Sequence, residues 1–324
     1  MDRSGRSGRL IRSARLRLGI PTEELARAAR LLVVRSRRES AGLFTGNYAS
    51  AFRGGGLEFE ESRPYQAGDD VRSIDWNATA RHRTTYVKHF REERDQSLLF
   101  VLDASASMRA GQPVRSKAAT AAHAIALLCA AAGRAGDRVG LVVFDESVRE
   151  VVPVGRGLAH GWRVVQSAVE AAATPRGSTR LEAALRALRI HGRRRTVAVV
   201  LSDFREAPGR DTGWALRQVL GELSRRHDVV AAPVLDRLEL SLPRVGPVRV
   251  ADPERPGRSW VLDTGSRRTR RRYLDACAER RRELADAVRH GGADLLWLRT
   301  DQSPLHALGR FFHERAARRH RIAS

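Results

Sequence analysis

The chain has 324 residues, of which 42% are hydrophobic and only 6% aromatic, so it can bury the core of one ordinary domain plus an accessory segment. Its formal net charge is +22, and only two of its 59 basic residues, Lys88 and Lys117, are lysines. This charge attracts polyanions and anionic membranes, but the arginines are spread along the chain without a recognisable nucleic-acid module, so a basic nucleic-acid-binding protein is an alternative and not the leading hypothesis.

The first 95 residues are expected to form two regions. Residues 1–20 are rich in Arg, Ser and Gly and are interpreted as a flexible basic arm. Residues 21–95 are interpreted as a lead-in that packs on the domain after it. The lead-in begins with a helix from Pro21 to about Arg38, for which Thr22 is a good start signal. It continues as an irregular segment with a short strand from Tyr86 to Phe90.

Strand and helix patterns alternate over residues 96–320. Continuous apolar runs such as SLLFVL predict strands that are buried on both faces, and apolar residues at helical spacing lie between these runs. Strands are predicted at Ser97–Leu102, Arg138–Phe144, Val148–Val154, Thr196–Leu201, Val229–Leu235 and Asp294–Leu298, with a strand pair at Val248–Val250 and Ser259–Leu262. Helices are predicted at Lys117–Arg134, from Leu158 to about Val169, at Leu181–Ile190, Trp214–Arg226 and Arg267–His290, and at the C-terminal end. The alternation predicts a doubly wound, mostly parallel α/β sheet of the Rossmann type, covered by helices on both faces.

The composition also bears on the cellular compartment. Cys129 and Cys277 lie in helical patterns and are expected to be buried apolar residues, and no CxxC motif or Cys/His cluster indicates a zinc site. The N-terminus lacks the apolar core of a signal peptide. The longest apolar stretch, Ala124–Ala132, is shorter than the ~20 residues that span a bilayer. These features predict a cytoplasmic protein without an integral membrane segment.

A DxSxS string follows the first buried strand and places Asp103, Ser105 and Ser107 in one tight turn. Carboxylate and hydroxyl oxygens suit Mg²⁺ or Mn²⁺, although the same residues also cap helices. Thr179 lies in a loop between two predicted helices, and Asp203 follows the strand at 196–201. In a doubly wound sheet the carboxyl ends of the strands share one edge, and ligands bind where the strand order reverses. The sequence therefore predicts that five oxygen-bearing side chains converge there.

This set resembles the metal-ion-dependent adhesion site, or MIDAS, of von Willebrand factor A domains. The resemblance implies direct ligation of the metal by the hydroxyls of Ser105, Ser107 and Thr179. The carboxylates of Asp103 and Asp203 often act through water in that family, and an acidic side chain of a partner fills the open coordination position. It implies a protein-binding module without catalytic residues.

The segment before the DxSxS strand narrows the family. Its motifs are Glu58-Phe59, Arg63-Pro64-Tyr65, the run from Gly68 to Trp76, and Ala80-Arg81. They resemble the signature of the bacterial domain-of-unknown-function 58 family, over Phe52 to Asp203 and more loosely beyond. Family context implies a MoxR-type AAA+ ATPase as the partner, in the assembly or maturation of other proteins.

Two further groups are candidates for partner docking. Within the signature, the charged residues are interpreted as an ion-pair network that docks the lead-in, with direct contact to a partner as the alternative. Asp145 and Glu146 are expected on a hairpin at the metal edge, as a solvated turn or as a rim that modulates affinity. The signature candidates are Asp69, Asp70, Arg72, Asp75, Trp76 and Arg81.

A second function class is a magnesium-dependent hydrolase or phosphatase, which would need a nucleophile or a general base beside the metal. No Walker A loop, GxSxG elbow or HExxH motif is present. Gly155-Arg156-Gly157 superficially suggests a dinucleotide site, but Pro153 and the lack of a matching acidic residue argue against it.

Overall fold

The computed structural model of the chain describes residues 22–43, 47–52, 57–66, 69–70, 73–82, 84–92, 96–112, 115–191, 196–205, 212–253, 255 and 257–323. The predicted basic arm at residues 1–20 and Arg72 of the signature lie outside the described residues.

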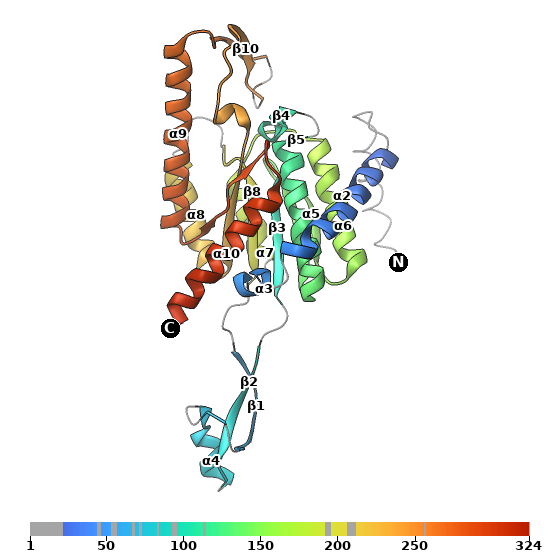
Figure 1. Cartoon of the computed structure of the whole chain (residues 1–324), viewed down its shortest axis with the longest axis vertical. Coiled ribbons are helices and arrows are strands. Elements are labelled where there is room, and N and C mark those ends of the chain that lie inside the picture. The colour runs from blue at the N-terminus through green and yellow to red at the C-terminus, as the bar shows by residue number, and fades with distance from the viewer. Residues whose placement is uncertain are drawn as a thin grey trace.

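A seven-stranded sheet forms the centre of the molecule (Figure 1). Its order is β12-β9-β8-β3-β6-β7, with β13 also paired to β9. All pairs are parallel except β6 with β7. The bounds are β3 Ser97–Asp103, β6 Arg138–Phe144, β7 Val148–Gly155, β8 Val197–Ser202, β9 Asp228–Leu235, β12 Asp294–Leu295 and β13 Leu298–Arg299. The predicted doubly wound, mostly parallel α/β sheet is confirmed.

Helices cover both faces of this sheet, which explains the uninterrupted apolar runs in its strands. Leu98, Phe100 and Leu102 of β3 point into one core, whereas Leu99 and Val101 point into the other. Each such buried side chain contributes about 1.5–3 kcal/mol to stability. The first core is covered by α2 (Thr22–Leu43), α3 (Asn47–Phe52), α5 (Lys117–Ala135), α6 (Leu158–Ala173) and α10 (Pro304–Ala323). The second is covered by α7 (Leu181–His191), α8 (Thr212–Ser224) and α9 (Arg267–His290).

Helix α5 runs through the first core and its ends are well defined. The Ser116 hydroxyl accepts a hydrogen bond from the Ala119 N–H at the start, and Gly136 ends the helix with a φ of 78°, a left-handed conformation that glycine adopts without strain. Within the described residues α5 is the one helix long and apolar enough to cross a membrane, but 67% of that window is buried inside the fold. It has the properties of a core helix.

The last predicted strand, 294–298, is not continuous in the structure. It is divided into β12 and β13. Asp294 and Leu295 are aligned with Val230 and Ala231 of β9, and Leu298 is aligned with Val234. The gap stands opposite Pro233, which has no N–H to donate to a ladder.

The C-terminal helix α10 ties α3 to the edge of the sheet. The buried Arg315 side chain of α10 pairs with Asp228 and with Asp294, the latter at 2.8 Å, and donates to the Ala51 carbonyl at 2.9 Å. Its guanidinium also lies over the ring of Phe52, 5.1 Å from the centroid. Helix α3, which precedes the signature segment, is thereby fixed to the body.

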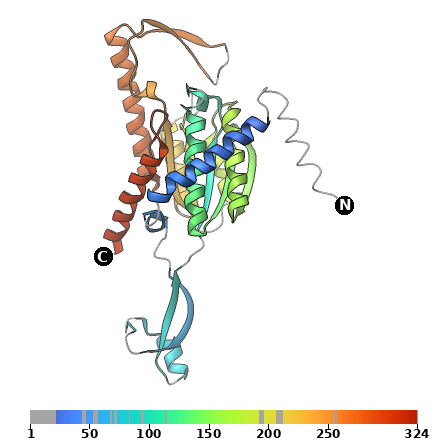
Figure 2. The same cartoon turned by 45° about the vertical axis from the view of Figure 1, so that its right-hand side comes forward.

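The signature segment itself projects from the body. Strands β1 (Leu57–Pro64) and β2 (Tyr86–Glu92) form an antiparallel pair, and α4 (Trp76–His82) packs on it. Figures 1 and 2 show this unit, the described residues of 57–92, extending away from the sheet at the amino ends of its parallel strands. We call it the extension. The lead-in predicted for residues 21–95 is thus divided. Helices α2 and α3 pack on the body as predicted, whereas the extension projects from the body, contrary to the prediction.

A hairpin and the first half of α9 stand at the opposite end of the molecule (Figure 1). The hairpin consists of β10 (Pro247–Ala251) and β11 (Ser259–Asp263), close to the predicted strand pair. The short elements at this end are η2 (Ala106–Arg109), β4 (Gly111–Gln112), β5 (Arg115–Ser116) and η3 (Arg237–Glu239). The carboxyl ends of the parallel strands face this end.

Candidate metal centre

The strand order reverses beside β3. From β3 the chain crosses to β6 on one side of it, and β8 lies on the other side, so the topological switch point lies between the carboxyl ends of β3 and β8. Asp103 is the last residue of β3, and Asp203 follows β8 directly. The fold therefore places the two aspartates at the position where doubly wound sheets bind ligands.

The fully buried Asp103 carboxylate is the centre of the site. Its Oδ1 accepts a hydrogen bond from the Ser105 backbone N–H at 2.8 Å. Its Oδ2 lies 3.1 Å from the Thr179 hydroxyl and 2.5 Å from the Ser202 hydroxyl. Both carboxylate oxygens are thus held by neutral donors from three different segments.

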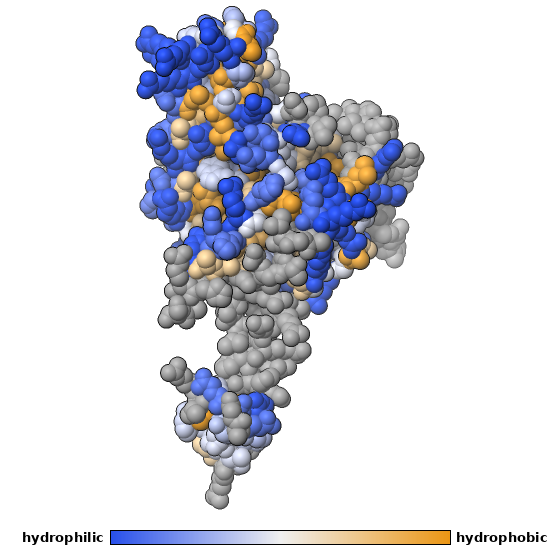
Figure 3. All heavy atoms as spheres, viewed as in Figure 1, coloured by the Kyte–Doolittle hydropathy of each residue, from blue (hydrophilic) through white to orange (hydrophobic). Residues whose placement is uncertain are grey.

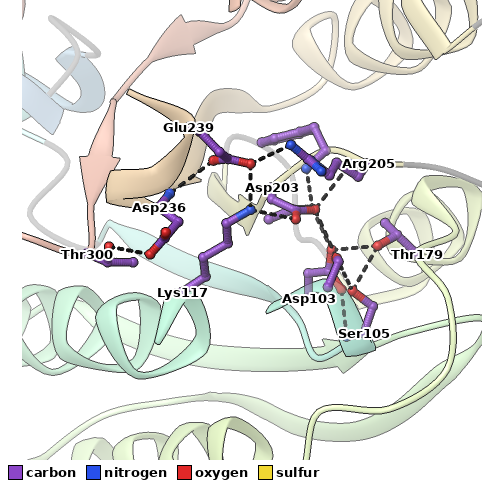
Figure 4. Close-up of polar contacts among 12 residues, drawn as sticks. Asp103, Ser105, Lys117, Thr179, Asp203, Arg205, Asp236, Glu239 and Thr300 are labelled. Atoms are coloured by element: carbon purple, nitrogen blue, oxygen red, sulfur yellow. Dashed lines mark hydrogen bonds and ion pairs between the residues drawn. The ribbon is translucent and has the colours of Figure 1, made fainter. Parts of the chain in front are cut away.

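The remaining hydroxyls continue the cluster. Thr179 Oγ1 lies 2.9 Å from Ser105 Oγ, which lies 3.1 Å from Ser107 Oγ. Ser107 donates to Asp203 Oδ1 at 3.2 Å. The structure thus brings together all five side chains predicted as metal ligands, and each is buried (Figure 4 labels four of them): Asp103, Ser105, Ser107, Thr179 and Asp203.

The Thr179 loop is attached to the DxSxS turn by backbone hydrogen bonds. Ala106 N–H donates to the Gly177 carbonyl at 2.9 Å, and Arg176 N–H donates to the Ala104 carbonyl at 2.9 Å. Gly177 has a φ of 70°, which a residue with a Cβ adopts only with strain. The turn and the loop therefore move as one unit, and Thr179 is held over the carboxylate.

Asp145 and Glu146 lie beside that loop, in the turn between β6 and β7. The Asp145 carbonyl accepts from the Arg180 N–H at 3.1 Å. The exposed Glu146 accepts from both the N–H and the hydroxyl of Ser178, at 3.2 and 3.0 Å, and these bonds lower the pKa of Glu146. Both residues hold the loop that carries Thr179.

Lys117 is a component of the site that the sequence reasoning missed. This side chain, only 2% exposed at the start of α5, places Nζ 2.9 Å from Asp203 Oδ2 and 3.1 Å from Glu239 Oε1 (Figure 4). Arg205 donates to the same Glu239 oxygen at 2.5 Å. Asp203 therefore faces the hydroxyl cluster with one oxygen and a buried ammonium with the other.

Glu239 is itself fixed by local structure. Its Oε2 accepts from the Asp236 N–H at 3.0 Å, and the Asp236 side chain accepts from the Leu238 N–H at 2.9 Å, an arrangement that satisfies the free donors at the start of η3. Thr300, beside β13, donates to Asp236 Oδ2 at 2.9 Å. Glu239, one of the two acidic partners of Lys117, is thus held in a fixed position.

The two aspartates differ in their electrostatic surroundings. Burial and the negative charge of Asp203 raise the pKa of Asp103 to about 7. Burial also acts to raise the pKa of Asp203, but the positive charges of Lys117 and Arg205 outweigh it and bring that pKa below its ordinary value. Within the described residues, the Asp103 side of the site is held by neutral groups alone.

The donor set fits a hard divalent cation. Each of the three hydroxyls and two carboxylates lies within hydrogen-bonding distance of another member of the set, and oxygen ligands of this type suit Mg²⁺ or Mn²⁺. The part of the chain that the structure describes contains no group of three or more His, Cys, Asp or Glu residues placed to hold a metal. The candidate site therefore depends on Ser105, Ser107 and Thr179 as much as on its carboxylates.

A cleft adjoins the site on the side of α9. Its volume is about 390 Å³, and its lining runs from Asp203 and Phe204 to Arg280 and Leu284. Phe204 has a φ of 52°, unlike every other described residue that is not glycine, and such strain persists only where the surroundings enforce it. The buried Phe204 ring packs in the second core, which holds Asp203 at the mouth of the cleft.

The signature residues lie in the extension and far from the metal centre. Arg63 binds the Asp69 carboxylate with two nitrogens at 2.9 and 2.6 Å. Asp75 accepts from the Ser62 hydroxyl at 2.6 Å and from the backbone of α4. The predicted ion-pair network thus stabilises the extension internally and does not dock it on the body. Of the signature residues named as docking candidates, Asp70, Trp76 and Arg81 are exposed.

Comparison with known proteins identifies relatives for most of the chain. Residues 61–283 match the family described as "Protein of unknown function DUF58". Uncharacterized proteins of Mycobacterium tuberculosis and Mycobacterium bovis are 34% identical over 304 residues, which is 93% of this chain and 92% of each relative.

Solved structures with a similar arrangement of sheet and helices have much lower identity. The conserved hypothetical protein BatB from Bacteroides thetaiotaomicron is 15% identical with a TM-score of 0.42, over 68% of this chain and 99% of that one. The SpRpn10 VWA domain is 13% identical with a TM-score of 0.37, over 66% and 93%. A von Willebrand factor type A protein from Catenulispora acidiphila is 13% identical with a TM-score of 0.37, over 72% and 43%.

Proposed function

Because this chain belongs to the DUF58 family and has a von Willebrand factor A-like α/β fold, we propose that it is a non-enzymatic, metal-dependent protein-binding module. The observation that carries the proposal is the convergence of five oxygen-bearing side chains from three segments on the switch point of the sheet. Ser105, Ser107 and Thr179 hold Mg²⁺ or Mn²⁺ through their hydroxyls, and Asp103 and Asp203 contribute directly or through water.

A divalent cation held by these residues would act as a Lewis acid, and an acidic side chain of the partner would bind to it. Lys117 neutralises one oxygen of Asp203, so the protein's own side chains leave the metal with uncompensated positive charge. A carboxylate from outside balances that charge, whereas a lysine or an amide does so poorly. The chain itself therefore selects for an acidic partner residue.

The surroundings of the site favour the same partner. Several exposed arginines lie on the hairpin and the first turns of α9, at the same end of the molecule as the metal centre. Much of the surface in the upper part of Figure 3 is hydrophilic. Charges of one sign accelerate association with an oppositely charged protein and lose this effect as salt screens them. On the described residues of this hairpin and of the first turns of α9, the exposed arginines are Arg249, Arg255, Arg258, Arg267, Arg268, Arg271 and Arg272.

We propose a MoxR-type AAA+ ATPase as the partner, with the pair acting in the cytoplasm in assembly or maturation of other proteins. This step depends on the family resemblance alone. A metal-dependent hydrolase has less support, since it needs a nucleophile or a general base beside the metal, and the side chain of Lys117 is already paired with two carboxylates.

The proposal is tested by binding of the full chain to a purified MoxR-type ATPase from the same organism, with Mg²⁺, with EDTA, and across salt. We expect EDTA and Thr179→Ala each to increase the dissociation rate at least about tenfold, in line with loss of a central contact. Thr85→Ala is the matched control, because the side chain of this threonine is exposed in the extension, at the opposite end of the molecule from the cluster. If EDTA and Thr179→Ala leave binding unchanged, the metal centre is not the docking point.

A further inference from the structure

The extension differs from the body in its charge. Residues 57–92 contain seven acidic and six basic residues, a net charge of −1, so the rest of the chain carries +23. The extension projects from the end of the molecule opposite the metal centre (Figures 1 and 2). It is therefore a nearly neutral unit held away from a strongly basic body.

Helix α4 exposes one continuous face on this unit. Trp76, Asn77, Ala80 and Arg81 are exposed, whereas Ala78 and Thr79 are half-buried. At 3.6 residues per turn, the exposed residues cover an arc of about 140°. Trp76 has 70% of its surface exposed, although an indole is among the side chains that gain most from burial.

The rest of the extension holds this face rigidly. Asp75 accepts hydrogen bonds from the N–H groups of Asn77 and Ala78, both at 3.1 Å, and its own N–H donates to the Tyr86 carbonyl at 2.8 Å. At the next turn, the Thr79 hydroxyl accepts from the Tyr86 N–H at 2.9 Å. Both anchors lie on the side of α4 that faces β2. A helix whose backbone is already fixed loses little conformational freedom when it is bound.

We propose that this face of α4 is a second docking surface, and that it binds a protein with an apolar pocket for the Trp76 indole and a carboxylate beside that pocket for Arg81. Trp and Arg are the residue types most enriched among side chains that dominate protein interfaces. The near-neutral charge of the extension favours a protein over nucleic acid or an anionic membrane, which would bind the basic body instead. This surface is independent of the metal centre.

The experiment uses the full chain in its native cell, with a photoreactive benzoylphenylalanine at Asn77 on the exposed face. The same residue at the exposed Thr85, outside α4, is the control for nonspecific cross-linking. A protein cross-linked only from position 77 is then purified, and its affinity for the full chain is measured. We expect Trp76→Ala to weaken that affinity at least about tenfold, and Arg81→Glu to be restored by a charge reversal beside the partner's pocket.

Two controls separate this effect from misfolding and from general charge. Trp76 is exposed, so the circular dichroism and unfolding midpoint of Trp76→Ala should equal those of the unchanged protein. Arg271→Glu alters a side chain of α9 that is 83% exposed and should leave the affinity as it was. The proposal is overturned if position 77 yields no specific cross-link, or cross-links only to a second copy, nucleic acid or lipid. It is equally overturned if the purified partner binds Trp76→Ala as well as the unchanged protein.

Discussion

The two ends of the molecule differ in how deeply their charged side chains are buried. At the carboxyl edge of the sheet, Asp103, Asp203 and Lys117 are removed from water and held in one network. In the extension, the ion pair between Arg63 and Asp69 lies near the surface, with side chains 30% and 20% exposed. Buried charges are costly unless each is compensated, whereas surface pairs contribute little. Paired buried charges are therefore essential to the stability of the metal-centre end, whereas ion pairs contribute little to the stability of the extension.

Of the variants that test this comparison, Lys117→Met should have the largest effect on stability. The substitution leaves Asp203 and Glu239 buried without their shared cation, so we expect the free energy of unfolding to fall by about 3–5 kcal/mol. Urea denaturation in EDTA measures the loss. Arg271→Met is the matched control, because the ion pair of Arg271 with Asp275 is 83% and 73% exposed and should change stability by less than about 0.5 kcal/mol. Equal midpoints for the two variants would contradict a structural role for the buried cation.

A smaller effect is expected in the extension from Asp75→Ala. This change removes the cap of α4 and the bond from Ser62, and a lost cap costs about 1–2 kcal/mol. The loss should be local, so amide hydrogen exchange in α4 should accelerate while the global unfolding midpoint stays the same. Asn77→Ala, on the exposed face of the same helix, is the control. A fall in the global midpoint would show that the extension and the body unfold together.

The body and the extension should also differ in how their stability depends on pH. His123 of α5 lies 3.5 Å from Glu39 of α2, and burial, together with the charge of Arg35, lowers the pKa of His123 below 6.5 despite Glu39. The unfolded chain therefore binds a proton at a higher pH than the folded chain does. Folded-state stability should fall as pH decreases from 6.5 towards the folded pKa.

Unfolding midpoints measured across pH 7 to 5 should show this decline, and His123→Asn should make it shallower. Hydrogen exchange in α4 should not follow the same profile after correction for the intrinsic exchange rate. An identical pH profile in unchanged and His123→Asn protein would exclude His123 as its source.

The smallest expected effect is that of removing the extension. Replacing residues 57–92 by a short Gly-Ser linker should leave the thermal midpoint of the body within about 2 °C, because β1, β2 and α4 pack chiefly on one another and a shift of 2 °C corresponds to less than about 1 kcal/mol. Calorimetric binding of Mg²⁺ should also be retained. A large loss of stability would show that the extension belongs to the core of the body.

Much of the fold was predictable because its signals are local. Continuous apolar runs identify β3, β6 and β9, since each lies between two layers of helices. The predicted Asp294–Leu298 strand was wrong in its continuity, because the gap is imposed by Pro233 on a neighbouring strand. The extension was misjudged for a related reason: its acidic and turn-forming residues satisfy one another, so nothing requires them to pack on the body.

The five predicted ligand residues were found from a spaced motif, but their neighbours were not. Lys117 meets Asp203 across 86 positions and Glu239 across 122 positions of the sequence, and no local pattern encodes such contacts. One signal was available: Lys117 is a lysine in a chain that otherwise uses arginine almost throughout. Ser202, which binds Asp103, gave no comparable signal. The metal itself stays a prediction.

The geometry around Lys117 also limits which mutations the gene can accumulate. A single base change turns the lysine codon AAG into the arginine codon AGG. At most positions the change is harmless, because charge is retained. Here the compact ammonium lies between two carboxylates at 2.9 and 3.1 Å, and a planar guanidinium needs a wider site and different angles. Lys117→Arg should therefore lower the stability of the folded chain even though it retains the charge.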